Sequence, residues 1–262
     1  MDWAETLRSQ ISILAGQYAE KYDISHLVTP SGVVIFKEDL DNGLNGNFIE
    51  ASYKTILNDE NWKKRLQKPH PHFESDSNIR ELDSCTSSDA LLMNIFCFPD
   101  VIEERLLGKL LGITGFQQPE FGYEPGVMKN GSRDKTEIDM KIGKVIFESK
   151  LTENNFTDKE KHVVERYDNF HKVFNSADLF QDESNYKNYQ LIRNVLAAFE
   201  NGFSFYLLCD ARRPDLVREF YFTVRCVRDQ NLRSRCCIIF WQEIADSVNL
   251  NLRFFLKEKY GL

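Results

Sequence analysis

The sequence predicts a mixed α/β (α+β) fold in which helices flank a central mixed sheet. Two short strands joined by Gly143-Lys144 form a hairpin pattern, and the stretches FSFYLLC (203–209) and RCCIIFW (235–241) are typical of buried strands. Helical patterns precede the hairpin and alternate with the buried strands, which is the order expected of helices packed on a sheet. The 262 residues are enough to bury a sizeable core.

The beginning of the chain predicts a mostly helical extension, residues 1–68, ahead of a main domain at 69–262. The first 22 residues carry acids within their first five positions and lack the basic start and continuous apolar core of a signal peptide. The elements expected here are a helix at 1–22, a strand at 31–36, a polar loop at 37–47, a helix at 48–66 and an irregular connection at 67–85.

The main domain begins with helical patterns. SSDALLMNIF (87–96) opens with serines and an acid in its first turn, and Pro99 separates it from a second helix at 100–112. The helix at 186–201 ends at Gly202, a favourable C-cap residue. Its apolar stripe consists of Tyr189, Ile192, Val195, Leu196 and Phe199. The remaining elements are a strand at 121–128, a hairpin at 136–150, a helix at 157–174, a helix or helix–strand mixture at 214–227 and a final helix at 243–259.

The hairpin TEIDMKIGKVIFESK (136–150) sorts its side chains by chemistry. Gly143 suits the first position of a two-residue type II′ turn. The expected pairs are Ile142 with Val145, Met140 with Phe147, Asp139 with Glu148 and Glu137 with Lys150. Apolar side chains then share one face, and the charged ones share the other. Two carboxylates directly opposite each other have β-carbons about 4.5–5.5 Å apart and repel, unless a cation or a shared proton lies between them.

A divalent ion would resolve this repulsion. Mg²⁺ or Mn²⁺ prefers oxygen ligands, and Lys150 could position or deprotonate a water or stabilise negative charge on a phosphate. Such parts are suited to hydrolysis of a phosphodiester. The alternative is a solvated strand face with ordinary cross-strand Glu–Lys pairing, because an Asp followed within about ten residues by Glu-x-Lys is common by chance.

Three sequence blocks carry a resemblance to a known superfamily. They are SSDALLMNIF (87–96), EIDMKIGKVIFESKLTE (137–153) and YQLIRNVLAA (189–198). Asp139 followed by FESK (147–150) resembles the PD-(D/E)xK nuclease superfamily, and the three blocks in this order resemble bacterial restriction-endonuclease-like proteins. The similarity covers roughly residues 70–245 and leaves the first 65 or so unexplained.

The resemblance implies a restriction-endonuclease-like core made of a helix, a three-stranded hairpin sheet, a helix and a further strand. It implies that Asp139 and Glu148 are metal ligands and that Lys150 is the catalytic lysine. Ile138 stands where the superfamily's name has Pro, a departure that many relatives share. Relatives often add a Glu from the first core helix, and Glu104 is the candidate here, with plain surface solubility as the alternative.

Two further sets of polar residues are candidates for contact with the substrate. Gln190 and Arg193 fall on one side of the helix at 186–201, together with Asn194. Relatives place a Gln or a basic residue there, which implies that Gln190 orients water or phosphate and that Arg193 neutralises phosphate charge. Residues 210–235 hold seven arginines against four acids, and Arg212 and Arg213 are candidates for tracking a phosphate backbone. The alternative in both cases is ordinary polar surface.

Composition limits the classes of function. The net charge of −7 argues against a protein that coats DNA by charge alone, although it allows a locally basic groove. No apolar run reaches about 18 residues, so no membrane span is expected. The six cysteines form no CxxC pair and are interpreted as reduced thiols of a cytoplasmic protein. His70-Pro71-His72 is interpreted as a loop, not as a zinc site.

We therefore expect a Mg²⁺-dependent endonuclease that hydrolyses DNA. By analogy, cutting both strands favours a homodimer. The alternatives are a catalytically silent module of the same fold that binds nucleic acid or a protein partner, and a phosphohydrolase that acts on RNA or nucleotides.

Overall fold

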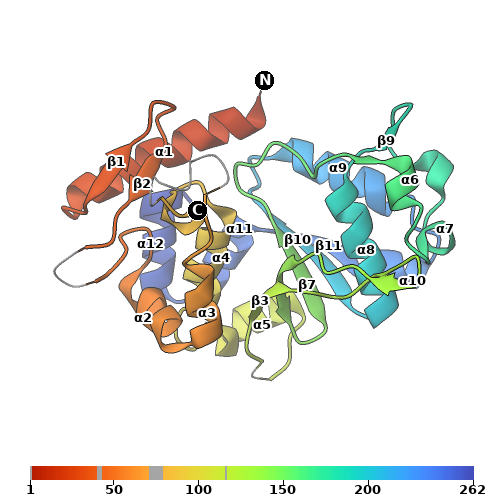
Figure 1. The fold of residues 1–262 in the computed structure, drawn as a ribbon. Coiled ribbons are helices and arrows are strands. Elements are labelled where there is room, and N and C mark those ends of the chain that lie inside the picture. The colour runs from red at the N-terminus through yellow and green to blue at the C-terminus, as the bar shows by residue number, and fades with distance from the viewer. Residues whose placement is uncertain (1, 40–42, 71–78, 116) are drawn as a thin grey trace. The chain divides into compact units, whose positions relative to one another are not determined.

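The computed structural model describes residues 2–39, 43–70, 79–115 and 117–262 (Figure 1). Unit 1 comprises Met1–Gln117 and Trp241–Leu262, and unit 2 comprises Gln118–Phe240. These units divide the chain at other places than the expected boundary between 68 and 69. Residues 40–42 of the expected polar loop, and Pro71 and His72 of the histidine motif, lie outside the described residues.

Unit 1 is mainly helical. Its elements are α1 (Trp3–Lys21), β1 (His26–Val28), β2 (Val34–Phe36), α2 (Glu50–Asn58), α3 (Glu60–Arg65), α4 (Ser88–Phe96), α5 (Arg105–Leu111), α11 (Trp241–Ser247) and α12 (Leu250–Tyr260). The expected helix at 48–66 is two helices, because the Asp59 carboxylate accepts hydrogen bonds from the backbone of Asn61 and Trp62 and starts α3. The expected final helix is also two, since Asn249 caps α12 in the same way.

Unit 2 contains the central sheet. Its elements are β3 (Glu120–Tyr123), β4 (Met128–Lys129), β5 (Ser132–Arg133), β6 (Ile138–Ile142), β7 (Val145–Ser149), β8 (Lys159–Glu160), α6 (Lys161–Val164), α7 (Phe170–Val173), β9 (Asn185–Tyr186), α8 (Tyr189–Asn201), β10 (Ser204–Cys209), α9 (Pro214–Val224), α10 (Gln230–Arg233) and β11 (Cys236–Phe240). The sheet has the order β11-β10-β7-β6-β3, with β10 parallel to β7 and β11 and the other pairs antiparallel. This confirms the predicted mixed α/β fold.

The register of the β6–β7 hairpin agrees with the prediction. Ile142 pairs with Val145 and Met140 with Phe147. Gly143 has a φ of 57° while Lys144 is not in the positive region, as a type II′ turn requires. Ile138, Met140 and Ile142 are buried, whereas Asp139 and Lys141 between them are partly exposed, so the expected alternation of faces holds along β6.

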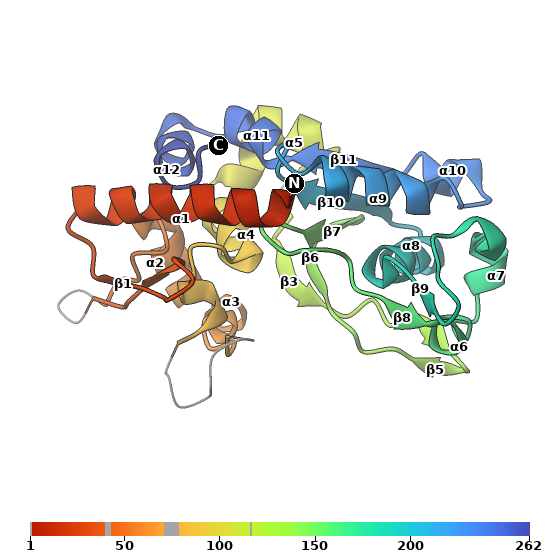
Figure 2. The same ribbon diagram turned by 90° about the horizontal axis from the view of Figure 1, so that it is seen from above.

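The core of unit 2 forms where α8 packs on the sheet (Figure 2). Ile192, Val195 and Leu196 of the predicted stripe are fully buried, and Tyr189 and Phe199 pack at its margin. Gly202 ends the helix in the left-handed conformation, with a φ of 67°. Burial of this stripe fixes the rotation of α8 about its own axis. The rotation in turn fixes where the polar side chains near the first turn of α8 point.

The segment 157–174 differs from the prediction of one helix. It contains β8 and the short helices α6 and α7. The backbone between the two helices bonds to the β4–β5 arm, where the Asn130 amide donates to the Arg166 carbonyl and the Asp168 amide donates to the Met128 carbonyl. These contacts between distant segments replace the helix. The expected strand at 121–128 is also interrupted, since Gly126 adopts a φ of 65° between β3 and β4.

All six cysteines are free thiols, and five of them are buried. Among the described residues, no helix combines the length and the apolar character that crossing a membrane would need.

Candidate active site

The two hairpin carboxylates come from neighbouring strands, Asp139 from β6 and Glu148 from the end of β7. Glu148 is almost fully buried there, at 1% exposure. Asp139 lies on β6, and its Oδ2 accepts hydrogen bonds from the backbone amide of Ser149 at 2.6 Å and from the Ser149 hydroxyl at 3.2 Å. Because Ser149 directly follows Glu148, the Asp139 carboxylate is held beside that strand end.

Glu148 accepts hydrogen bonds from two amides of α8. Its Oε1 receives the Gln190 Nε2 donor at 2.9 Å, and its Oε2 receives the Asn194 Nδ2 donor at 2.7 Å. A buried carboxyl group costs several kcal/mol unless hydrogen-bond donors satisfy it, so these two amides offset the cost of burying Glu148. The helix thus fixes the carboxylate in one orientation.

Lys150 completes the group as a buried cation. Its Nζ lies 3.0 Å from Glu148 Oε1, and the residue is 6% exposed. Burial lowers the pKa of the Lys150 ammonium, but the carboxylates of Glu148, Glu153 and Asp139 outweigh burial and raise it above its usual value. The side chain is therefore a fixed positive charge, which is suited to stabilising an anion.

Gln190 leaves an acceptor at this site. Its Nε2 is used by Glu148, while its Oε1 is buried and has no hydrogen-bond partner among the described residues. Buried polar atoms are nearly always paired, so an orphan oxygen beside two carboxylates indicates a donor that comes from water or from a ligand.

The site residues suit a hard divalent ion. Asp139 and Glu148 supply carboxylate oxygens, which Mg²⁺ prefers, and Mg²⁺ keeps several waters instead of requiring an all-protein cage. No cluster of three or more His, Cys, Asp or Glu residues that could hold a metal occurs in the described part of the chain. The donor set therefore fits an ion held by two carboxylates and water, with the Gln190 oxygen available to accept from such a water.

Arg193 forms hydrogen bonds to other residues of unit 2. It is 5% exposed and donates to the Glu137 carbonyl at 2.9 Å, and to Asn194 Oδ1 through Nε at 3.3 Å and Nη2 at 3.1 Å. These bonds orient the Asn194 amide so that its NH₂ group points at Glu148. The expected contact of Arg193 with phosphate stays a prediction, and its observed contacts are those of a positioning residue.

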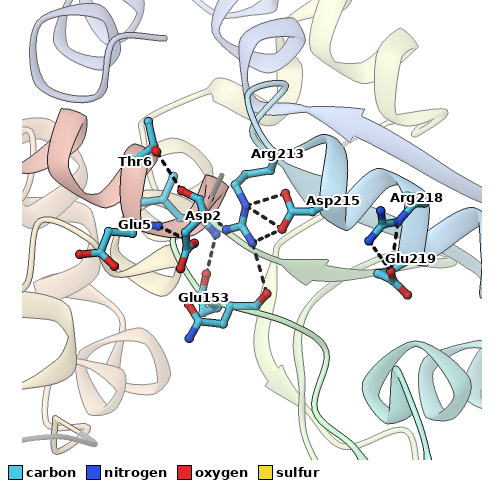
Figure 3. A network of polar contacts seen from close by, with 10 residues as sticks. Asp2, Glu5, Thr6, Glu153, Arg213, Asp215, Arg218 and Glu219 are labelled. Atoms are coloured by element: carbon cyan, nitrogen blue, oxygen red, sulfur yellow. Dashed lines mark hydrogen bonds and ion pairs between the residues drawn. The ribbon is translucent and has the colours of Figure 1, made fainter. Parts of the chain in front are cut away.

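Both arginines that follow the end of β10, Arg212 and Arg213, bind carboxylates of the same segment, and Figure 3 shows the contacts of Arg213. Arg213 is fully buried, binds the Asp215 carboxylate at 2.8 Å and donates to the Leu151 carbonyl at 3.2 Å. Arg212 binds the buried Asp210 at 2.7 Å. Arg213 therefore anchors the loop that follows β7, and phosphate binding by either arginine stays a prediction.

Three participants were not assigned a role from the sequence. Ser149 holds Asp139, Asn194 holds Glu148, and Glu153 contributes to the raised pKa of Lys150. The role of Asn194 could have been predicted from its spacing, because it lies four residues after Gln190 and therefore on the same side of the helix. Glu104, the expected extra acid, precedes α5 in unit 1, and its catalytic role stays a prediction.

Comparison with known proteins identifies one family. A family model described as "restriction endonuclease associating with ARP" matches residues 10–261. No curated protein matches the chain, and no solved structure matches it. The match spans nearly the whole chain, including the N-terminal residues that the superfamily resemblance left unexplained.

Proposed function

The chain belongs to the family of restriction endonucleases associating with ARP, and from this premise we propose that unit 2 is a Mg²⁺-dependent endonuclease that hydrolyses DNA phosphodiester bonds. The observation that carries the proposal is Glu148, a buried carboxylate held by Gln190, Asn194 and Lys150 next to Asp139. Such a concentration of buried charge costs stability, so it needs a functional reason.

Each side chain has a role in the proposed reaction. Asp139 and Glu148 would hold the ion, which when bound supplies Lewis-acid stabilisation of the phosphate and lowers the pKa of a water. Lys150 stabilises the negative charge that develops on the phosphate in the transition state. Gln190 accepts a hydrogen bond from the attacking water through Oε1 and so orients it. Asn194 and Arg193 keep Glu148 in place.

Cleavage of supercoiled plasmid tests the proposal. We expect nicking or cutting with Mg²⁺ and none with EDTA, and Asp139→Asn and Lys150→Met should each lower the rate by about 10²-fold or more. Lys141→Met is the matched control, because Lys141 also pairs with a glutamate on this sheet, Glu120, which is exposed. The control should cut at the wild-type rate.

Two results would contradict the proposal. Equal cleavage by the Asp139→Asn variant would remove the role of the hairpin carboxylate. A wild-type chain that cuts RNA of the same sequence but not DNA would assign the site to a different substrate.

The family description also names an associated protein, ARP. We propose that the endonuclease acts together with such a protein. Co-purification of the two chains expressed together tests this association, and separate elution of both at micromolar concentration would contradict it.

A further inference from the structure

Two tyrosines and two lysines form a second cluster in unit 2, which we name the tyrosine–lysine platform: Lys129, Lys159, Tyr167 and Tyr189. We propose that this platform binds the phosphate backbone of a nucleic-acid strand that leaves the active site. The proposal rests on the proposed function, because it extends the same substrate beyond the scissile phosphate.

The two tyrosines are locked together. The Tyr167 hydroxyl donates to the Asp134 carboxylate, and the Tyr167 and Tyr189 hydroxyl oxygens lie 2.7 Å apart. An ionised carboxylate can only accept, so the Tyr167 proton points to Asp134 and Tyr189 must donate to Tyr167. The ring centroids are 6.5 Å apart with an interplanar angle of 30°. Both rings therefore have a fixed orientation.

Asp134 provides the anchor for this pair. Its Oδ1 accepts the Thr136 backbone amide at 2.9 Å and the Thr136 hydroxyl at 2.6 Å. Burial raises the pKa of Asp134, but the hydrogen bonds from Thr136 and Tyr167 outweigh burial and lower it. The anchor is thus ionised at neutral pH.

The lysine ammonium groups lie over the two rings. Lys129 Nζ is 4.8 Å from the centroid of Tyr167, and Lys159 Nζ is 6.0 Å from that of Tyr189. Within the described residues neither forms an ion pair, whereas Lys141 and Lys187 are bound to carboxylates. The rings hold the two cations in place without neutralising them. The Lys129 ammonium also lowers the pKa of the Asp134 carboxylate, so its charge is partly balanced, whereas Lys159 is exposed. Both lysines keep positive charge for an anionic ligand.

The platform is continuous with the active site. Tyr189 directly precedes Gln190 in the first turn of α8, and the Phe156 and Thr157 carbonyls accept the amides of Gln190 at 3.0 Å and of Tyr189 at 2.9 Å. The Phe156 ring lies 5.8 Å from Lys150 Nζ. The segment that lines the catalytic lysine therefore runs on, three residues later, to Lys159.

The chemistry of this cluster suits a nucleic-acid strand. Proteins that bind a nucleic-acid strand without sequence preference combine positive charges, which contact phosphates, with aromatic rings, on which bases stack. The platform offers both, because its two cations lie beside a partly exposed aromatic ring. Arg133 and Lys135 on the neighbouring arm are exposed and add positive charge, while the nearby Asp158 is bound to Lys187 at 2.6 Å. The arginines that the sequence favoured are paired internally, so the platform offers the better phosphate contacts.

A salt titration of DNA binding tests the platform. The full chain and the double variant Lys129→Gln/Lys159→Gln are titrated with fluorescent duplex DNA in EDTA, at several NaCl concentrations. Each lost phosphate contact reduces the slope of log K against log salt by about 0.9, so the slope should become shallower by about 1.8. Both substitutions remove charge and keep a side chain of similar length, so the fold is retained.

Lys172→Gln is the matched control. Lys172 Nζ also lies over an aromatic ring, 5.1 Å from the Phe199 centroid, but at the opposite end of α8. Its slope should equal that of the wild type.

An unchanged slope in the double variant, or no DNA binding by the wild-type chain, would overturn the platform. A shallower slope in the double variant, together with a wild-type chain that binds DNA but fails to cut it, would instead support the platform and overturn the proposed nuclease activity. The two failures are therefore distinguishable.

Discussion

At the scale of single residues, Asn194 is the side chain through which α8 controls the buried carboxylate. It is fully buried, donates to Glu148 and accepts from Arg193. Asn194→Ala leaves both partners with an unmet hydrogen bond away from water. We expect the free energy of unfolding to fall by about 1–3 kcal/mol and kcat to fall with it. Urea denaturation and plasmid cleavage measure the two effects.

Asn201→Ala is the control on the same helix. Asn201 is exposed, and its amide donates to the Ala197 and Pro125 carbonyls. Its loss should change stability by about 0.5 kcal/mol or less and leave kcat unchanged. Equal effects of the two substitutions would show that Asn194 has no special role.

Burial of Lys259 in unit 1 makes the free energy of unfolding depend on pH. It is fully buried, its ammonium donates to the Asn47 carbonyl and to Asn47 Oδ1, and no carboxylate pairs with it among the described residues. Burial lowers the pKa of Lys259 well below its usual value, and Cys85 opposes this only in part. In the unfolded chain the Lys259 ammonium keeps its proton up to about pH 10.4, whereas the folded chain binds this proton less well. Raising the pH towards that value removes this penalty on folding, so the free energy of unfolding should rise.

Lys259→Met tests this sign. The variant should show a flatter dependence of the free energy of unfolding on pH between 7 and 10 than the wild type. Denaturant titrations at several pH values supply the measurement. A variant with the same pH dependence as the wild type would show that Lys259 keeps its usual pKa when folded.

At the scale of elements, the hairpin and α8 could be predicted because their signals are local. A turn glycine, strict alternation and a stripe of apolar residues are all contained in a short stretch of sequence. The site followed from them, since the two elements carry Asp139, Glu148, Lys150 and Gln190. The helix predicted at 157–174 was wrong because the β4–β5 arm, distant in sequence, takes its backbone hydrogen bonds.

The arginines between 210 and 235 show that a count of charged residues does not reveal which charges are paired within the protein. Three of the four acids in that stretch are the partners of neighbouring arginines: Asp210 with Arg212, Asp215 with Arg213 and Glu219 with Arg218. Figure 3 shows the last two of these pairs. The local excess of positive charge is therefore smaller at Arg212, Arg213 and Arg218 than the count suggests, and phosphate binding by Arg212 or Arg213 stays a prediction. Side-chain directions, which the sequence does not contain, decide which charges are available.

Alanine substitutions at two glycines of unit 1 test the packing around α1 and β2, because they should change the free energy of unfolding in opposite directions. Gly16 lies inside α1, where an added β-carbon would meet Val34 Cγ2 at an ordinary 3.8 Å. Gly16→Ala should raise the free energy of unfolding by up to about 1 kcal/mol, because alanine loses less entropy in a helix. Thermal or urea denaturation measures the change.

Gly46→Ala should have the opposite effect. Its β-carbon would lie 2.1 Å from Ile24 Cγ2 and 3.1 Å from Phe36 Cδ1, so the Ile24 side chain must shift and the buried Phe36 ring must move by a few tenths of an ångström. Overpacking of this kind costs about 1–3 kcal/mol. Two substitutions that change stability in the same direction would contradict this account of the packing.

At the scale of the whole molecule, charge divides unequally between the units. Unit 1 has 14 basic and 21 acidic residues, a net charge of −7, while unit 2 has 19 of each and is neutral. Unit 2 therefore repels a polyanion less than unit 1 does, and it is the unit that carries the candidate site and the tyrosine–lysine platform. The acidic unit 1 is better suited to contact with a protein.

The expected homodimer is also a whole-molecule prediction. Cutting two strands in one encounter needs two sites, and a symmetric pair of chains supplies them. Sedimentation at micromolar concentration should give twice the mass of one 30.6 kDa chain, and plasmid should be linearised without accumulation of nicked circles. A monomer that only nicks would contradict this prediction.

The proposed nuclease activity requires that Asp139 and Glu148 together hold a divalent ion at the end of β7. Metal binding is measured by isothermal titration of the chain with Mn²⁺, in parallel with the Asp139→Asn and Lys141→Met variants. We predict one saturable site in the wild type and in Lys141→Met, and its loss in Asp139→Asn. Binding that is absent from the wild type, or unchanged in Asp139→Asn, would contradict the claim.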